Sequence, residues 1–146
     1  MGNIHKFTEN VRSRYGGFSN AFGGETNDLI TSAEFVNMEN YDLVAAVAHA
    51  SGLASDSVIT LAMWQATASG GGGSKTVSGA SDTFTSTNTT DTDVLVAQVR
   101  GEDLDVANSF LFVGAKLATD NASGTEKVGM ILHQMRARNK QATLPA

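Results

Sequence analysis

The sequence contains no cysteine, one proline, one tryptophan and two tyrosines among its 146 residues. Without cysteine the chain has no disulfide, no thiolate zinc site and no cysteine nucleophile, so its fold depends on packing alone. No segment has the unbroken apolar length of a membrane span or of a secretory signal, which predicts a soluble chain with no membrane partner. The motifs Asn88-Thr89-Thr90 and Asn121-Ala122-Ser123 match the glycosylation pattern, but we expect them to be polar turns.

Positive charge is also scarce, because the formal net charge is −5. This balance argues against nucleic acid as the partner, since phosphate binding requires clustered lysine and arginine. The charge is unevenly placed: residues 1–20 carry +2, residues 126–146 carry +3, and the middle therefore carries −10. The two basic ends are either steered toward an acidic surface or are simply solvated tails.

Groups that could perform chemistry do not converge in the sequence. His5, His49 and His133 are isolated from one another and from carboxylates at metal-ligand spacing. The acidic cluster at 102–105 lacks the spacing of a calcium loop, and the glycine run at 70–73 lacks the lysine and hydroxyl residue of a phosphate-binding loop. We therefore predict that the chain is not an enzyme and has no catalytic residue, no cofactor and no metal site.

The first 28 residues combine glycines with four scattered aromatic side chains and show no sustained periodicity. We interpret residues 1–28 as an extended N-terminal arm. An arm that only frays is usually poor in aromatic residues, so these rings are interpreted as anchors for a partner or a neighbouring subunit. The alternative is a loop folded over its own domain. The four rings belong to Phe7, Tyr15, Phe18 and Phe22.

From residue 29 the texture changes to short apolar and β-branched runs separated by turn residues, which predicts strands. No link is long enough for a crossover helix, so we expect an all-β fold: an antiparallel β-sandwich or jelly-roll-like domain of about eight strands over 29–140, with a short C-terminal tail at 141–146. One helical turn is expected near 101–105. The predicted strands are 30–37, 42–50, 57–67, 75–78, 82–86, 93–100, 109–119 and 126–138.

Alternation within the predicted strands supports this fold class. In segment 128–136, Val128, Met130 and Leu132 share one face, with Ile131 and His133 on the other. Trp64, the single tryptophan, is interpreted as a core or sheet-packing residue rather than a platform for a ligand.

The order of segments resembles the capsid cement, or decoration, proteins of tailed phages over about 110 residues. The resemblance implies a noncatalytic β domain that binds the outside of an assembled major-capsid-protein shell, as a dimer or trimer, and stabilises it. It implies a virion location on the capsid exterior after synthesis in the host cytoplasm. It rests on segments 33–41, 43–48, 58–67, 75–77, 94–100, 102–105, 110–113 and a last basic strand.

Two other functions stay open from the sequence. One is a tail or head-to-tail connector protein, which has similar small β domains and arms. The other is a carbohydrate-binding β-sandwich, although such modules usually expose several aromatic rings. For a capsid partner we predict contacts in the arm and the basic end, and that deleting residues 1–24 abolishes binding while the domain stays folded. The predicted contact residues are Phe7, Arg12, Arg14, Tyr15, Phe18, Phe22, Arg136 and Arg138.

Overall fold

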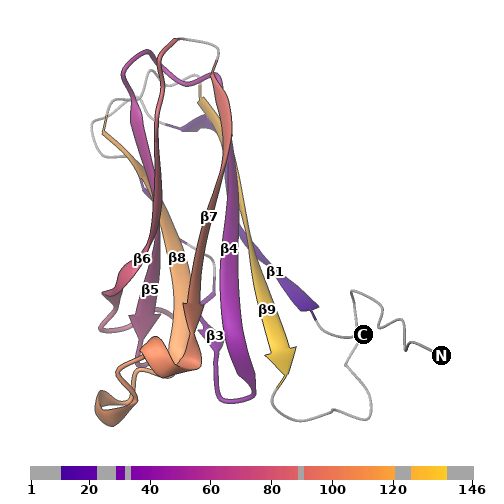
Figure 1. Cartoon of the computed structure of the whole chain (residues 1–146), viewed down its shortest axis with the longest axis vertical. Helices are drawn as coiled ribbons and strands as arrows, with labels where there is room; N and C mark the ends of the chain where they lie inside the picture. The colour runs from indigo at the N-terminus through magenta and orange to yellow at the C-terminus, as the bar shows by residue number, and fades with distance from the viewer. Residues whose placement is uncertain (1–10, 23–28, 32–33, 89–90, 121–125, 138–146) are drawn as a thin grey trace, which may run out of the picture.

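A computed structural model of the chain describes residues 11–22, 29–31, 34–88, 91–120 and 126–137. Nine strands and two short 3₁₀ turns make up this part of the chain (Figure 1). The turns are η1 (Gly101–Asp103), at the expected helical turn, and η2 (Val106–Asn108). The strands are β1 (Val11–Phe22), β2 (Leu29–Thr31), β3 (Val36–Asn37), β4 (Tyr41–Ser51), β5 (Val58–Ala66), β6 (Lys75–Thr85), β7 (Thr92–Arg100), β8 (Phe112–Thr119) and β9 (Glu126–Ala137).

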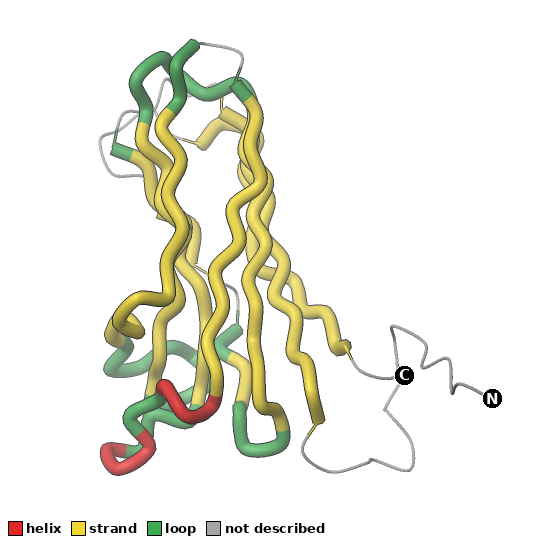
Figure 2. The backbone as a smooth tube through the Cα atoms, in the orientation of Figure 1, coloured by secondary structure: helices red, strands yellow, loops and turns green. Residues whose placement is uncertain are grey.

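The strands form two antiparallel sheets packed face to face (Figure 2). Sheet A has the order β1-β9-β4-β7, and sheet B has the order β2-β8-β5-β6, with β3 also paired to β8. The pairing is nested, because β1 pairs with β9, β2 and β3 with β8, β4 with β7, and β5 with β6. A long antiparallel hairpin rolled into two layers gives this order, which is that of a jelly roll. The predicted fold class is confirmed.

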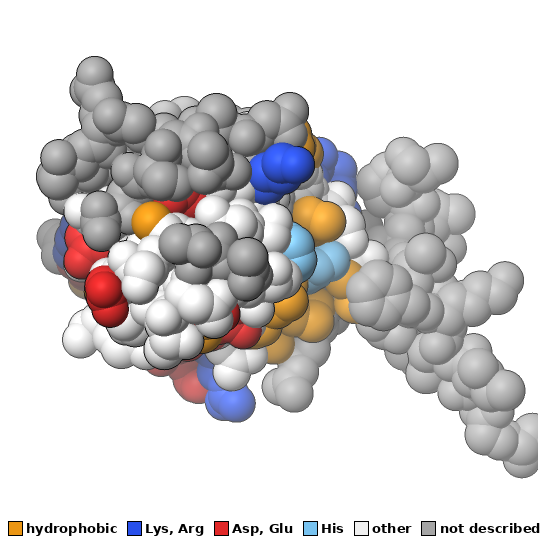
Figure 3. All heavy atoms as spheres, turned by 90° about the horizontal axis from the view of Figure 1, so that it is seen from above, with side chains coloured by type: hydrophobic (Ala, Val, Ile, Leu, Met, Phe, Trp, Pro, Cys, Tyr) orange, Lys and Arg blue, Asp and Glu red, His pale blue; other side chains and the backbone are white. Residues whose placement is uncertain are grey.

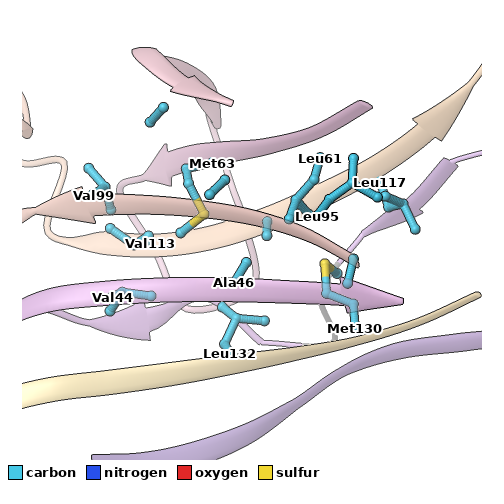
Figure 4. Packing of buried hydrophobic residues seen from close by; sticks show 14 of the residues in the cluster. Val44, Ala46, Leu61, Met63, Leu95, Val99, Val113, Leu117, Met130 and Leu132 are labelled. Carbon is cyan, nitrogen blue, oxygen red and sulfur yellow. The ribbon is translucent and has the colours of Figure 1, made fainter. Parts of the chain in front are cut away.

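Side-chain alternation builds the core between the sheets. In β7, Leu95, Ala97 and Val99 are buried, whereas the residues between them are exposed. In β4 the inward positions are mostly alanine, which lets the two sheets lie close together, and larger side chains from the other strands fill the remaining space. Figure 4 shows Leu61, Met63, Leu117, Met130 and Leu132 meeting in this layer.

The two sheets are also joined along one side. The edge strands β6 and β7 come from different sheets, and the backbone N–H of Val96 donates to Asp82 Oδ2 at 2.9 Å. Because the acceptor is a side chain, the two edges are linked without forming a continuous ladder. This contact helps to cover two strand edges that would otherwise be open to another chain.

The boundary expected between arm and domain differs from the observed one. Residues 11–22, expected in the arm, form β1, an edge strand of sheet A paired with β9. The sequence pattern concealed it because Gly16 and Gly17 interrupt the alternation. Residues 1–10 and the tail 141–146 lie outside the described part of the chain.

Two smaller differences concern strand ends. The predicted strands 75–78 and 82–86 are one strand, β6, with a register shift opposite Ala62 and Trp64. Gly79 has φ +74°, a value that residues other than glycine rarely adopt. The glycine lies in a bulge of β6, and the sequence pattern predicted a turn there. The predicted strand 30–37 is divided into β2 and β3.

Candidate functional site

The central part of the outer face of sheet A, turned away from the core, is built from sixteen residues in four rows across the sheet, and Ser51, Thr92 and Lys127 extend the face beyond the row of Phe18. The register places one residue of each strand in every row, in the order β1, β9, β4, β7. The rows are Phe18, Gly129, His49 and Val94; Tyr15, Ile131, Val47 and Val96; Ser13, His133, Ala45 and Gln98; and Val11, Met135, Leu43 and Arg100.

This face gathers most of the large apolar side chains that the described chain exposes. Tyr15 is 65% exposed, Phe18 58%, Val94 53%, Val96 50% and Ile131 48%. Of the exposed large hydrophobic residues described, one lies elsewhere, Val106 in η2 at 55%. Scattered apolar side chains are normal on a protein surface, but a contiguous set on one sheet marks a contact surface.

A bulge in β1 brings Tyr15 and Phe18 to the same face. Residues three apart on a regular strand point to opposite faces, but the register shifts between Tyr15 and Gly17, so one extra residue is inserted. That residue is Gly16, and a Cβ there would lie 2.5 Å from the carbonyl oxygen of Met130. Only glycine allows β1 to approach β9 this closely, and both rings then lie on the outer face of sheet A.

Phe18 lies beside a glycine in the neighbouring strand. Gly129 is its partner on β9, and a Cβ built on Gly129 would meet Phe18 Cδ2 at 3.5 Å, an ordinary contact distance. The ring thus extends beside a backbone that has no side chain of its own, a pairing that protects glycine in sheets. In this row β9 therefore contributes no side chain to the outer face.

Permanent charge on the described outer face of sheet A lies at its two ends, and the rows between them are uncharged. Arg100 lies in the last of the four rows, with its Nη1 3.4 Å from Glu102 Oε1, and the exposed Lys127 lies beyond the first row. His133 Nδ1 is hydrogen-bonded to Ser13 Oγ at 3.0 Å. Figure 3 shows apolar surface beside the histidine side chains. A face of this composition favours contact with another apolar surface rather than with a polyanion.

The outer face of sheet B has the opposite character. Thr60 on β5 is hydrogen-bonded across to Thr83 on β6, with 3.3 Å between the hydroxyl oxygens, and Ser81 and Thr85 are exposed on the same strand. Trp64 is half-buried on β5, and Lys116 Nζ lies 3.4 Å from its ring centroid. The ammonium group occupies the ring face that it covers, so a ligand would have to displace it to stack there.

The sequence-predicted contact residues divide into three groups. Tyr15 and Phe18 lie on the outer face of sheet A. Arg12 and Arg14 are opposite Gln134 and Leu132, whose side chains are buried, so they lie on the inner side of β1. Phe22 and Arg136 belong to β1 and β9, but their side chains are outside the described part, as are Phe7 and Arg138 altogether.

Sequence reasoning missed Val94, Val96 and Ile131 as surface residues. A signal was present, because residues 94–97 are apolar on both faces of the predicted strand. Such a run is typical of a strand covered on both sides. In the described structure β7 is covered on its inner face alone, so Val94 and Val96 on its outer face are exposed.

A pocket of about 290 Å³ opens at the end of the sandwich where β1 of sheet A is near β3 of sheet B. We call it the arginine pocket. Arg14 Nη1 lies 4.0 Å from Glu34 Oε2, at the limit of an ion pair. The pocket is lined by Arg12, Arg14, Glu34, Phe35, Val36, Asn37, Asn40, Tyr41, Ser69, Phe112 and Gln134.

Perturbed carboxylates in the described chain have structural partners. The backbone N–H of Thr87 donates to Asp91 at 2.7 Å, and this bond, ahead of that from Asn88, holds the pKa of Asp91 below its usual value. Asp91 thereby holds Thr87 and Asn88, which follow β6. Within the described residues no three histidine or acidic side chains are grouped to hold a metal ion.

The described helical segments include none with the length and apolar character needed to cross a membrane.

No protein-family model matches the sequence, and no curated protein sequence matches it. Among solved structures, the fold is similar to that of vertex protein P5 of PRD1, with a TM-score of 0.52 and 8% identity over 88% of this chain and 98% of P5. A chain of Broad Bean Stain Virus gives 0.49 at 8% identity, covering 100% of this chain and 96% of that one. TmCBM61, solved with β-1,4-galactotriose, gives 0.40 at 8% identity, covering 88% and 92%. The similarity to the PRD1 vertex protein shows a shared jelly-roll fold.

Proposed function

We propose that this protein is a noncatalytic structural component of a virion, a cement protein of a phage capsid that binds the exterior of the assembled major-capsid-protein shell and stabilises it. The observation that carries the proposal is the exposed apolar centre of the outer face of sheet A, which lies between Arg100 at one end and Lys127 at the other. The jelly-roll fold shared with a PRD1 vertex protein, together with the resemblance of segment order to decoration proteins, supports the choice of a viral shell as the partner.

The size of the face supports a repeating partner. Four strands spaced about 4.8 Å apart, and six steps of about 3.4 Å between the first and last rows along each strand, give roughly 400 Å² for the four rows. A standard stable interface buries about 800 Å² on each partner, so one such face by itself supplies a weak attachment. A lattice, or a dimer or trimer of this chain, multiplies the weak contact by raising the effective concentration of the next one.

Charge placed on the outer face of sheet A is the direct test. We expect Phe18→Asp and Val96→Asp each to weaken binding to assembled shells of the same virus by about tenfold or more, because each buries a carboxylate in an apolar contact. Binding is measured by co-sedimentation of purified protein with shells. Unchanged melting temperatures show that the variants remain folded.

Two matched controls locate the effect. Val106→Asp changes a valine of similar exposure in η2, and Thr83→Asp changes the outer face of sheet B. Both are expected to bind as the unmodified protein does. If the two sheet A variants bind normally, the proposed docking face is wrong; if no form of the protein binds shells, the capsid role itself is wrong.

The alternatives predict other outcomes. A tail or connector protein would be found at a vertex or in the tail of intact particles rather than over the whole shell, as electron microscopy of labelled particles would reveal. A carbohydrate-binding module would bind glycans on an array and would not bind assembled shells. The lysine over Trp64 disfavours that module.

A further inference from the structure

The arginine pocket combines positive charge with apolar walls. Phe35 and Val36 are 4% and 6% exposed and form part of its lining, together with Phe112. Arg12, Arg14 and Glu34 are its charged residues, so the pocket carries a net charge of +1 within a chain whose net charge is −5. A local excess of one positive charge matches one negative charge rather than two.

Arg14 has hydrogen-bonding capacity that the described residues leave unused. Its Nε is buried and has no hydrogen-bond partner among them, and its contact with Glu34 is long at 4.0 Å. A guanidinium group presents Nε–H and Nη–H as a fork that matches the two oxygens of a carboxylate. Because Nε is buried, an incoming carboxylate reaches it only after the Arg14 side chain rotates toward the pocket, and that rotation removes a buried donor without an acceptor, which costs about 1–3 kcal/mol.

We propose that the arginine pocket binds the carboxylate of an acidic side chain, aspartate or glutamate, on a protein partner. Arg14 provides the bidentate contact, Arg12 adds charge, and Phe35 and Phe112 pack against the methylene stem. The volume of about 290 Å³ accommodates one or two side chains. A phosphate dianion fits less well, because Glu34 lies in the same pocket and repels the second charge. The inference rests on the proposed function only in taking the partner to be a protein.

The site can be tested without any capsid. The probe is N-acetylglutamate N-methylamide, titrated into labelled protein while the arginine Nε–H resonances are followed by NMR. We expect the Arg14 resonance to move and saturate, and the resonance of Arg100, outside the pocket, to stay in place. The glutamine analogue, which lacks the charge, is expected to leave both unchanged.

Three outcomes would overturn the proposal: no saturation with the glutamate probe, an equal response to the glutamine analogue, or saturation by inorganic phosphate at lower concentration than by the carboxylate. Arg14→Lys keeps the charge but loses the fork, and we expect it to weaken probe binding at least fivefold. If that variant does not fold, Arg12→Lys, with a smaller expected loss, replaces it. Normal shell binding together with a silent pocket would refute this inference alone, and a responsive pocket without shell binding would refute the capsid role alone.

Discussion

Gly16 is a single residue on which the outer face of sheet A depends. It supplies the extra position in β1 that brings Tyr15 and Phe18 to one side, and it lies against the backbone of Met130. Both features follow from the absence of a side chain. A substitution here therefore changes the stability of the sheet and the composition of its surface together.

Gly16→Ala is expected to destabilise the protein by about 1–3 kcal/mol, in the range of overpacked sites, because the new Cβ would meet a backbone oxygen that cannot rotate away. Urea unfolding measures the loss. Gly70→Ala is the matched control, since a Cβ there has no neighbour within 4 Å, and a change within about 0.5 kcal/mol is expected. Equal stability of both variants would contradict the close approach of β1 to β9.

Asp105 connects three segments near η2. Its carboxylate accepts hydrogen bonds from Lys75 Nζ at 2.6 Å and from Asn108 Nδ2 at 2.9 Å, and its backbone N–H donates to Gln65 Oε1 at 2.8 Å. The bond from Lys75, followed by that from Asn108, holds the pKa of Asp105 below its usual value. Lys75 Nζ also lies 4.2 Å from the centroid of the Phe110 ring, so both Asp105 and Phe110 hold the lysine in place.

The lowered pKa of Asp105 predicts a dependence of stability on acid. An unfolded aspartate titrates near pH ~3.9, and in the folded state the proton binds at lower pH, so the unfolded chain takes up protons first. The stabilisation is therefore present above that pH and is lost as the pH falls through the folded pKa. Asp105→Asn should lower the melting temperature slightly at pH 7. In this variant the melting temperature should also decrease less as the pH falls below ~4 than it does in the unmodified protein. Lys75→Met should reproduce the change at pH 7; a variant with the unchanged pH profile would contradict the assignment.

At the scale of elements, β1 has two roles. It covers one edge of β9 and carries two of the exposed rings. Gly16 and Gly17 within it are buried, which places the strand in the sheet rather than beside it. The expectation that residues 1–24 can be removed from a folded domain does not fit this structure, because their removal would leave β9 as a bare edge.

Two truncations separate the parts of the expected arm. Deleting residues 1–10 should keep a cooperative unfolding transition with a melting temperature within a few degrees of the full chain, since no described strand is lost. Deleting residues 1–24 should abolish that transition or cause aggregation. Circular dichroism and size-exclusion chromatography report both results. A stable, monomeric 1–24 deletion would show that β1 is dispensable to the fold.

For the whole molecule, the strands and their buried faces could be predicted largely from the sequence. Alternation in 128–136 correctly assigned Val128, Met130 and Leu132 to one face, and in the structure they point to the core. The candidate site was only half predictable. The rings at 15 and 18 were predicted to be partner anchors, and the structure shows them exposed. Their neighbours on β7 and β9 could not be predicted, because no local pattern states which strands become adjacent.

Composition and spacing alone were enough to establish an all-β chain without thiol chemistry, since turn residues and two-residue periodicity act over a few positions. The tertiary structure alone decided that residues 120 apart, such as Ser13 and His133, meet across one sheet. It also decided which face of that sheet is exposed. A shift of one residue in pairing exchanges the two faces of a strand, so only the assembled register could place the apolar rows outside and the arginine pair within.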